Sequence, residues 1–398
     1  MDHTTGKPAP SLLLLGIAGG LSPFGMAIVV PAMNSIAVQH SADFSAVQFV
    51  ISAYLFGLAI AQPVCGYLCD RFGRKPVMLV GFFVFIVASL LCAVAPNLDL
   101  LILARFVQAS GVSVGTVASR AILRDCYDKN RMAEAMSYIA AATGLAAIIA
   151  PVFGGMLDAS GGYAAIFWGT ALIGLIVFIG MLRSLVETLS PEIDVPRISD
   201  WLKSYRRLLS SPTFVGNTLM FGFVQGSFFS FMAIGSSLFA SKFDIQAGEF
   251  GLLWGLMAIN YALGSTIAAK ATPRVGTLAV LKFSALMNIV GGIAVFACAS
   301  IGELSIAKVF IPLGFLMAAA GAITPGAMAG AVSSHPTIAG TASGLSSAIG
   351  LVVGGSFSIF AGLIYAGDYQ PIALLTLTGC LAVTASWRLA LVVRQTQH

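Results

Sequence analysis

The sequence G-Y-L-C-D-R-F-G-R-K occupies residues 66–75 and separates two long apolar runs. Its charged residues are Asp70, Arg71, Arg74 and Lys75. Basic residues beside an apolar run are typical of a cytoplasmic anchor, because Lys and Arg are enriched on the cytoplasmic side of membrane proteins. An anchor alone does not explain the two glycines, Gly66 and Gly73, or an aspartate at the end of an apolar run. The stretch therefore indicates a specific turn between two membrane spans.

The composition around this turn is that of a membrane protein. Of the 398 residues, 58% are hydrophobic and 9% are charged, and the mean hydropathy is +0.93. A soluble chain carries about 25% charged residues, so most of this surface does not face water. Twelve helices of about 20 residues each would need about 240 apolar positions, close to what the chain supplies. The composition excludes disorder, a coiled coil and a disulfide scaffold, and no contiguous basic face is present for nucleic acid.

Apolar runs separated by short charged or Pro/Gly breaks predict twelve membrane spans. The runs are 11–33, 46–68, 76–95, 98–121, 132–156 and 162–184 in the first half, and 213–239, 247–269, 277–299, 304–327, 339–366 and 371–393 in the second. They show no alternation with a period of two, so barrel strands are not expected. The fold class expected is an all-α polytopic membrane protein with 12 transmembrane helices in two six-helix bundles.

The basic residues predict the orientation of these spans. All but three of the 21 Lys and Arg residues fall on one side; Lys242 and Lys308 fall on the other, and Arg105 lies inside a span. By the positive-inside rule both termini are cytoplasmic. We expect a multi-pass protein of a bacterial inner membrane, with the lipid bilayer as its surroundings, acting as a monomer.

The longest polar stretch divides six spans from six. The domains expected are an N-terminal bundle (1–184), a cytoplasmic linker with an amphipathic helix (185–211) and a C-terminal bundle (212–398). A weak internal repeat supports two halves, because R-F-G at 71–73 follows the second span and R-V-G at 274–276 follows the eighth. Internal repeats of this kind are common in transporters.

Residues 66–75 resemble the loop signature of the major facilitator superfamily, G-x-L-x-D-R-x-G-R-K, at all seven fixed positions. The resemblance implies a cytoplasmic latch that opens and closes as two bundles rock. Asp70 would face the N-terminal end of the eleventh span, and Arg71 and Arg74 would pair with Asp125 at the end of the fourth. The gating residues so implied are Gly66, Asp70, Arg71, Gly73, Arg74, Lys75 and Asp125.

Arg105 is the one basic residue well inside a predicted span. An arginine at mid-membrane costs about 2.5–3.5 kcal/mol even on lenient scales, so it must face the bundle interior or water. One interpretation is structural, a hydrogen bond to carbonyls of a neighbouring helix. The other is a proton relay or a charge that acts on the substrate, which we favour because intramembrane ionisable groups are functional by default. The segment resembles the family's R-x-x-Q-G motif, with Ala109 and Ser110 inserted before the glycine, and the resemblance adds Gln108 to the coupling or substrate-field group.

The fifth predicted span ends in a proline flanked by small residues. A proline here can mean only a kink, but small residues at packing spacing also permit close helix contact. The stretch resembles the motif of the antiporter branch, G-x-x-x-x-x-G-P-x-x-G-G, with Ala150 in place of the glycine before the proline. The matching residues are Gly144, Pro151, Gly154 and Gly155, and the resemblance implies export.

Residues 33–155 resemble the bicyclomycin/chloramphenicol resistance group of drug:proton antiporters. That group carries an acid in the first span, in D-M-Y-L-P, where this chain has A-I-V-V-P at 27–31. The carboxylates Asp70, Asp99, Asp125, Glu134, Glu249, Glu303 and Asp368 all lie near span ends. An exporter that exchanges a cation for protons needs a buried carboxylate that titrates, and the usual one is missing.

Three amides, Gln225, Asn260 and Asn288, fall near the middles of the seventh, eighth and ninth spans. Each alone is typical of a helix–helix hydrogen bond, while together they indicate a shared polar cavity equally well. Further candidates for lining a substrate cavity are Phe228, Tyr261, Met26, Tyr54 and Tyr138. The same positions also fit a packed core.

These features predict an efflux transporter of small organic molecules that works by alternating access, with proton-coupled antiport of the drug-resistance type. A positive centre without a buried acid favours a neutral or anionic substrate. Two alternatives stay open: an exporter or facilitator of a polar or anionic metabolite (a carboxylate siderophore, sugar or nucleoside) without proton coupling, and a non-transporting membrane sensor. An enzyme is not expected, because no nucleophile–base pair or phosphate loop is present. No metal and no cofactor beyond a proton gradient are expected.

Overall fold

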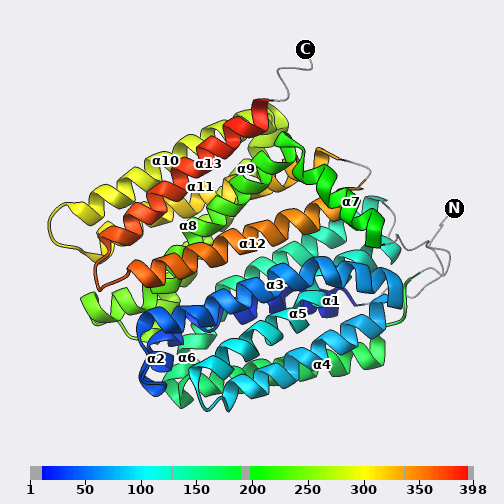
Figure 1. The fold of residues 1–398 in the computed structure, drawn as a ribbon, viewed down its shortest axis with the longest axis horizontal. Helices are drawn as coiled ribbons and strands as arrows, with labels where there is room; N and C mark the ends of the chain where they lie inside the picture. The colour runs from blue at the N-terminus through cyan, green and yellow to red at the C-terminus, as the bar shows by residue number, and fades with distance from the viewer. Residues whose placement is uncertain (1–10, 127–128, 190–197, 336–337, 393–398) are drawn as a thin grey trace. The chain divides into compact units, whose positions relative to one another are not determined.

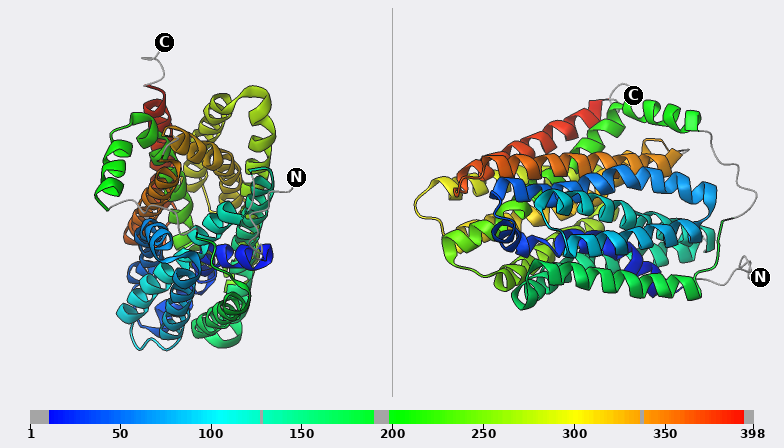
Figure 2. Two further views of the ribbon diagram at one scale, coloured as in Figure 1. Left: turned by 90° about the vertical axis from the view of Figure 1, so that its right-hand side faces the viewer. Right: turned by 60° about the horizontal axis from the view of Figure 1, so that its bottom comes forward.

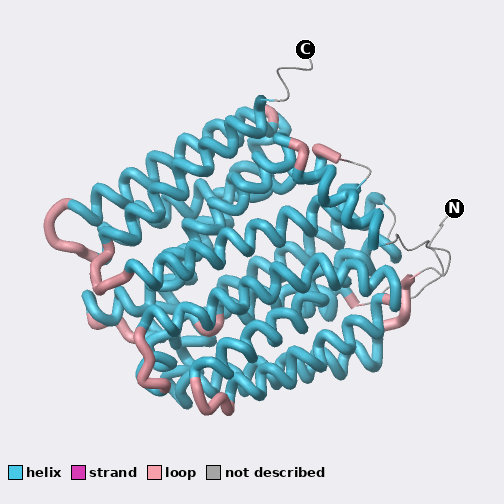
Figure 3. Tube along the Cα trace, viewed as in Figure 1, coloured by secondary structure: helices cyan, strands magenta, loops and turns pink. Residues whose placement is uncertain are grey.

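The computed structural model describes residues 11–126, 129–189, 198–335 and 338–392. Throughout these ranges the regular structure is helical and no strand occurs, which confirms the predicted all-α class (Figure 3). The loops are short and lie at the helix ends. Lys7, Arg197 and Arg394, which contributed to the predicted orientation, lie outside the described residues, as do both chain ends.

The helices follow one another with few intervening residues (Figure 1). They are α1 (Leu12–Ala27), the 3-10 helix η1 (Val30–Ala32), α2 (Met33–Gln39), α3 (Phe44–Phe72), α4 (Arg74–Ala93), α5 (Leu98–Cys126), α6 (Lys129–Ser184), α7 (Ile198–Leu209), α8 (Pro212–Phe243), α9 (Ala247–Val275), α10 (Thr277–Ser300), α11 (Ile306–Ser333), α12 (Ala339–Ile364) and α13 (Gln370–Val392).

Eleven helical segments of the described chain are long and apolar enough to cross a membrane. One of them, residues 142–184, has the length of two spans, because α6 turns at Gly161 and Gly162. Gly162 has φ 68° and ψ −179°, a conformation that a residue with a Cβ rarely adopts. This turn separates the predicted spans 132–156 and 162–184, so the segments correspond to the twelve spans expected.

The first predicted span, 11–33, is not one continuous helix. The helix α1 ends at Ala27, and the chain continues through η1 into α2. Pro31 explains the break, because proline lacks an N–H and its ring clashes with the carbonyl four residues earlier, which is that of Ala27. The break leaves carbonyl groups at the end of α1 available to other partners.

The chain forms two compact units. Unit 1 comprises residues up to 42 and 53–196; unit 2 comprises 43–52 and 197–398. In unit 1, α6 packs against α1 and α4, and α5 packs against α4 and α1. In unit 2, α8 packs against α12 and α13, and α11 packs against α9 and α10. Figure 2 shows that the long helices of each unit run alongside one another.

Helix α7 covers the segment in which a short amphipathic helix was expected. Leu208 anchors its end, because this side chain is buried with Phe214, Ala331 and Ala342 of unit 2. The next helix, α8, begins at a standard N-terminal cap. Ser211 accepts a hydrogen bond from the N–H of Phe214 at 3.3 Å, and Pro212 occupies the first helical position, where its missing N–H removes no bond.

Two glycines join consecutive helices in the same way. Gly73, between α3 and α4, has φ 100° and ψ 156°, and Gly276, between α9 and α10, has φ 85° and ψ 152°. Positive φ favours glycine at both turns. These are the two glycines of the internal repeat, so the repeat marks the same turn in both units.

The closest helix approach in the predicted antiporter stretch is between α6 and the end of α1. A Cβ added at Gly154 would overlap the backbone oxygen of Ile28, whereas a Cβ added at Gly144 on the same helix would meet nothing within 4 Å. Backbone cannot rotate away as a side chain can, so only glycine allows α6 to lie this close to α1.

The substitution Gly154→Ala should therefore destabilise the protein by at least about 1–3 kcal/mol, the usual effect of overpacking. Gly144→Ala should leave stability unchanged or raise it slightly, because alanine favours a helix. Thermal unfolding of the two purified variants in detergent measures the difference. Equal unfolding temperatures for both variants would contradict the close approach.

Candidate functional site

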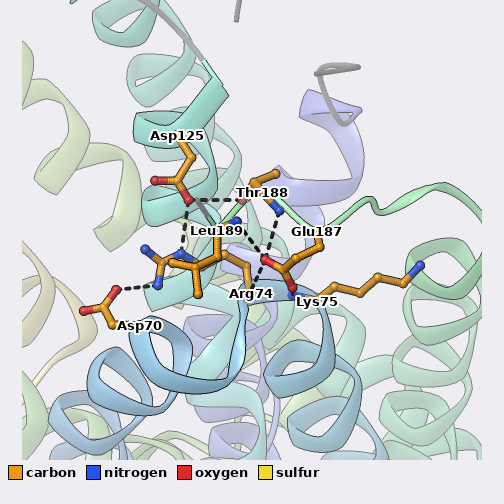
Figure 4. A network of polar contacts seen from close by, with 7 residues as sticks. All are labelled: Asp70, Arg74, Lys75, Asp125, Glu187, Thr188 and Leu189. Carbon is orange, nitrogen blue, oxygen red and sulfur yellow. Dashed lines mark hydrogen bonds and ion pairs between the residues drawn. The ribbon is translucent and has the colours of Figure 1, made fainter. Parts of the chain in front are cut away.

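The turn between α3 and α4 gathers charged side chains at one end of unit 1 (Figure 4). Arg74 at the start of α4 donates a hydrogen bond from Nε to Oδ2 of Asp125 at 3.2 Å, and its guanidinium forms an ion pair with Asp70. The side chain of Arg74 is 5% exposed, that of Asp125 is 14% exposed and that of Asp70 is 46% exposed. Arg74 is thus a buried cation held between two carboxylates, of which Asp125 is the less exposed.

A third carboxylate, Glu187, covers the N-terminus of α4. Its Oε1 accepts from the backbone N–H of Arg74 at 2.9 Å, and its Oε2 accepts from that of Lys75 at 3.1 Å. Glu187 also accepts from the N–H groups of Thr188 and Leu189. Because Pro76 has no N–H, Glu187 satisfies both of the N–H groups that the first three helical residues carry.

Gly73 makes this cap possible. A Cβ at Gly73 would lie 2.5 Å from Oε2 of Glu187, so a side chain there would push the carboxylate off the helix end. Burial raises the pKa of Glu187, but hydrogen bonds from the four N–H groups outweigh it and hold the pKa below the ordinary value for glutamate. The helix dipole favours the same charged form.

Thr188 joins the cap to the ion pairs, because its hydroxyl donates to Oδ2 of Asp125 at 3.1 Å. The other predicted gating residues lie elsewhere. Arg71 does not contact Asp125; its guanidinium donates to the hydroxyl of Tyr67 at 2.8 Å. The side chain of Lys75 points away from the network (Figure 4). A Cβ at Gly66 would meet only Val117 at 3.8 Å, so packing within unit 1 does not require glycine there.

Arg105 lies at the centre of unit 1 and is fully buried. Its Nη1 donates to the backbone oxygen of Gly25 at 3.0 Å and to Oε1 of Gln108 at 2.6 Å. Nε2 of Gln108 in turn donates to the hydroxyl of Ser89 at 2.7 Å. The predicted pair Arg105 and Gln108 is therefore one hydrogen-bonded group that links α5 to α1 and α4.

Aromatic rings complete the surroundings of Arg105. The guanidinium lies 4.1 Å from the ring centre of Tyr54 and 5.7 Å from that of Phe167, within the range of cation–π attraction. The hydroxyl of Tyr54 donates to the backbone oxygen of Ser22 at 2.9 Å. Gly25 can accept from Arg105 because α1 ends two residues later and leaves this carbonyl without a helical partner.

The structure brings the antiporter stretch to the same place. Gly154 lies against Ile28, three residues after the carbonyl that receives Arg105. Pro151 and Gly155 are buried, while Gly144 is exposed and contacts nothing closely. The buried cation and the small-residue face of α6 therefore meet at the end of α1.

The predicted cavity residues are dispersed. In unit 2, Asn288 is 1% exposed, and Asn260 donates to the Leu256 oxygen of its own helix at 3.0 Å. Gln225 is half-buried, and no hydrogen bond among the described residues joins the three amides. Phe228 packs against Trp254 at 5.4 Å and Tyr261 packs against the core of unit 2. Both aromatic side chains are half-buried.

In unit 1, Tyr54 is fully buried against Arg105, and Met26 is half-buried beside Gly25. Tyr138 is 44% exposed and lies beside Gly16 on α1. Tyr54 is thus the cavity candidate that contacts the buried cation. None of the groups of His, Cys, Asp and Glu in the described ranges is arranged to hold a metal ion.

Glu187, Thr188 and Ser89 were not predicted from the sequence. A signal for Glu187 was present, because α4 begins with Arg74 and Lys75, and two cations at a helix N-terminus are unfavourable unless a carboxylate lies nearby. Glu187 follows the sixth span directly and was within reach by topology. Ser89 carries no such signal, since a serine in an apolar helix more often bonds its own backbone.

The comparison with known families identifies the class of this chain. The sequence pattern of the Major Facilitator Superfamily matches residues 15–359. The chain belongs to the major facilitator superfamily and is a multi-pass membrane transporter, not an enzyme. The resemblance found in residues 66–75 is thereby confirmed.

Several curated proteins are similar along most of the chain. An uncharacterized MFS-type transporter, YdgK, of Bacillus subtilis is 28% identical over 91% of both chains. A bicyclomycin resistance protein homolog of Haemophilus influenzae is 25% identical over 94% of both chains. Multidrug resistance protein D of Escherichia coli is 27% identical over 89% of this chain and 86% of its own length.

Solved structures show the same fold at low identity. A D-xylose-proton symporter is similar with a TM-score of 0.75 and 15% identity, covering 95% of this chain and 96% of its own. A bacterial homolog to the human lysosomal transporter Spinster, in an inward-facing and unoccupied conformation, has a TM-score of 0.70 and 16% identity, covering 96% and 94%. Both support the twelve-helix architecture.

The Glu187 cap predicts a pH-dependent contribution to stability. Because folding lowers its pKa, the carboxylate stabilises the protein at pH values above the ordinary glutamate pKa, and this contribution disappears as the pH falls through the lowered value. At neutral pH, Glu187→Gln should lower the free energy of unfolding by about 1–2 kcal/mol, the usual effect of losing a cap. The difference from the unmodified protein should vanish on acidification.

Thermal unfolding between neutral and acidic pH measures this effect. Glu303→Gln is the matched control, because Glu303 is exposed in a loop of unit 2. The control should follow the unmodified protein at every pH. A Glu187→Gln variant with the same profile as the control would show that the cap contributes nothing.

Proposed function

We propose that this chain exports a small organic molecule across a bacterial inner membrane by alternating access, in exchange for protons. The observation that carries the proposal is the meeting of two features at the end of α1. The buried cation Arg105 binds the Gly25 carbonyl, and the antiporter-type face of α6 approaches Ile28. A movement of α6 against α1 would therefore shift the Gly25 carbonyl and change its hydrogen bond with Arg105. Similarity to a bicyclomycin resistance protein homolog and to multidrug resistance protein D supports a role in drug export.

The charge at this centre favours a neutral or anionic substrate. Arg105 is fixed by a carbonyl, an amide and two aromatic rings. Helix α1 carries no charged residue, and the acid of the D-M-Y-L-P motif is replaced by A-I-V-V-P at 27–31. A cation brought close to a desolvated guanidinium meets repulsion that is only weakly screened.

The Arg74 network is proposed as the gate at the cytoplasmic end. Asp70 is half-exposed, and the rest of the network is largely buried, so Asp70 is the member that can exchange partners. When Asp70 leaves Arg74 for another partner, the ion pair between Arg74 and Asp125 remains. The N-terminal end of the eleventh span, which begins near residue 339, is the partner proposed for Asp70 in the closed state.

A second candidate function is export or facilitated diffusion of a polar or anionic metabolite without proton coupling. The observation that favours it is the missing acid in the first span, where Val29 and Val30 are buried instead. Carboxylate siderophores, sugars and nucleosides are the substrate classes that fit. A non-transporting sensor is a weaker alternative for a chain of this family.

Transport by the purified protein in proteoliposomes distinguishes these functions. The test compares chloramphenicol, a citrate-type carboxylate and the cation tetraphenylphosphonium, each with and without an imposed pH gradient. We expect transport of the neutral or the anionic probe, faster with the gradient. Transport that ignores the gradient would replace antiport by facilitation, and transport of the cation alone would refute the assigned substrate charge.

The gate predicts different effects for its two aspartates. Asp70→Asn removes a half-exposed partner, so it should lower the turnover rate several-fold while substrate affinity and stability change little, because exposed ion pairs contribute about 0–1 kcal/mol. Asp125→Asn leaves the buried Arg74 with only the half-exposed Asp70 as its counter-charge and should destabilise by about 3 kcal/mol. Transport kinetics and thermal unfolding measure both. A large loss of affinity in Asp70→Asn would make Asp70 a binding residue.

A further inference from the structure

A polar cluster at the other end of unit 1 has no part in the gate or in the Arg105 group. It joins α2 to α6 on both sides of the Gly161–Gly162 turn. The hydroxyl of Ser35 on α2 donates to Oδ2 of Asp158 on α6 at 2.6 Å. Five residues further on in each segment, Nε2 of His40 and the hydroxyl of Tyr163 are hydrogen-bonded at 2.9 Å.

Asp158, which lies between the predicted spans 132–156 and 162–184, was not among the carboxylates named from the sequence. Its two oxygens differ. Oδ2 binds Ser35, whereas Oδ1 is buried and has no hydrogen-bond partner among the described residues. A buried carboxylate oxygen without a donor is unfavourable. A protonated carboxyl carries its own hydrogen and spreads less charge over the unpaired oxygen, so the protonated form suits this site better.

We propose that Asp158 is a proton-binding site of this transporter, at the end of unit 1 opposite to the Arg74 network, and that its proton determines how firmly α2 holds α6. The proposal rests on the proposed proton antiport, for which it supplies a carboxyl in place of the missing acid of the first span. The ionised group binds the hydroxyl of Ser35, and the uptake of a proton weakens that charged hydrogen bond.

The other titratable groups at this end are few. Helices α1, η1 and α2, which pack against α6, carry none within their bounds. His40 and Asp43 lie between α2 and α3, Tyr163 lies on α6, Cys92 lies near the end of α4 and Asp99 lies near the start of α5. Asp43 and Asp99 are exposed and His40 is bonded to Tyr163, so Asp158 is the carboxyl of this cluster that is bound by a neighbouring helix.

A chain of ring contacts connects this end to the buried cation. The rings of Tyr163 and Phe167 are 6.1 Å apart on one face of α6, and the ring of Phe167 is 5.7 Å from the guanidinium of Arg105. A change in the hydrogen bond between Ser35 of α2 and Asp158 of α6 therefore acts on the helix that packs against Arg105. Protonation of Asp158 would in this way change the surroundings of Arg105, although the proton itself stays at the end of unit 1.

Infrared difference spectroscopy of the full chain in lipid tests proton binding directly and needs no substrate. Spectra recorded on acidification from pH 8 to pH 5.5 should show the carbonyl band of one newly protonated carboxyl. The band should be absent in Asp158→Asn, shifted but present in Asp158→Glu, and unchanged in the control Asp99→Asn. In Ser35→Ala the midpoint of the band should move to higher pH, because the donor to the ionised form is gone. A band that survives Asp158→Asn, or a midpoint unmoved in Ser35→Ala, overturns the proposal.

Transport of chloramphenicol in the same proteoliposomes separates this inference from the proposed function. If the unmodified protein is stimulated by the pH gradient, Asp158→Asn should lose that stimulation and Asp99→Asn should keep it. If the unmodified protein transports but ignores the gradient, proton antiport fails, and the infrared result alone decides whether Asp158 binds a proton. Full gradient stimulation in a folded Asp158→Asn variant also overturns the proposal.

Discussion

The burial of the Arg105 guanidinium is the interaction around which the rest of unit 1 is arranged. A guanidinium has five N–H donors and cannot be neutralised at ordinary pH, and lipid offers it no partner. An interrupted helix supplies one of the acceptors that the guanidinium binds. Because α1 ends at Ala27, the Gly25 carbonyl is available to Arg105, while Gln108 and Ser89 extend the bonding to α4. The same interruption allows Gly154 of α6 to lie against Ile28.

Helix α6 relates this centre to both ends of unit 1. One end follows directly into Glu187, which caps α4 beside the Arg74 ion pairs. The turn at Gly161 and Gly162 places Asp158 and Tyr163 against the α2 segment at the other end. The carboxylates and cations of these two groups thus lie at the ends of unit 1, and Arg105 is the charged side chain described between them. This distribution follows from the high energy of ions in hydrocarbon.

Much of the fold could be predicted from the sequence, because hydropathy and the positions of Lys and Arg are sufficient to locate membrane spans. The turn at 66–75 also identified the family and the contact of Arg74 with Asp125. The break in α1 was missed, although Pro31 indicated it. Glu187 was missed although the two cations at the start of α4 indicated a nearby carboxylate. Asp158 was missed because its partner Ser35 lies more than a hundred residues away, and no local pattern reports that pairing. The amides of unit 2 were placed by depth alone, which cannot tell a cavity wall from a core.

The central claim is that the interior beside Arg105 becomes open to each side of the membrane in turn. Met26, half-buried beside Gly25, is the position that reports it. A Met26→Cys variant, in a chain whose six native cysteines are replaced, can be treated with a membrane-impermeant maleimide in right-side-out and in inverted vesicles. The predicted result is labelling from both faces, with the two rates changing in opposite directions when chloramphenicol is added. Labelling from one face only, under every condition, would contradict alternating access.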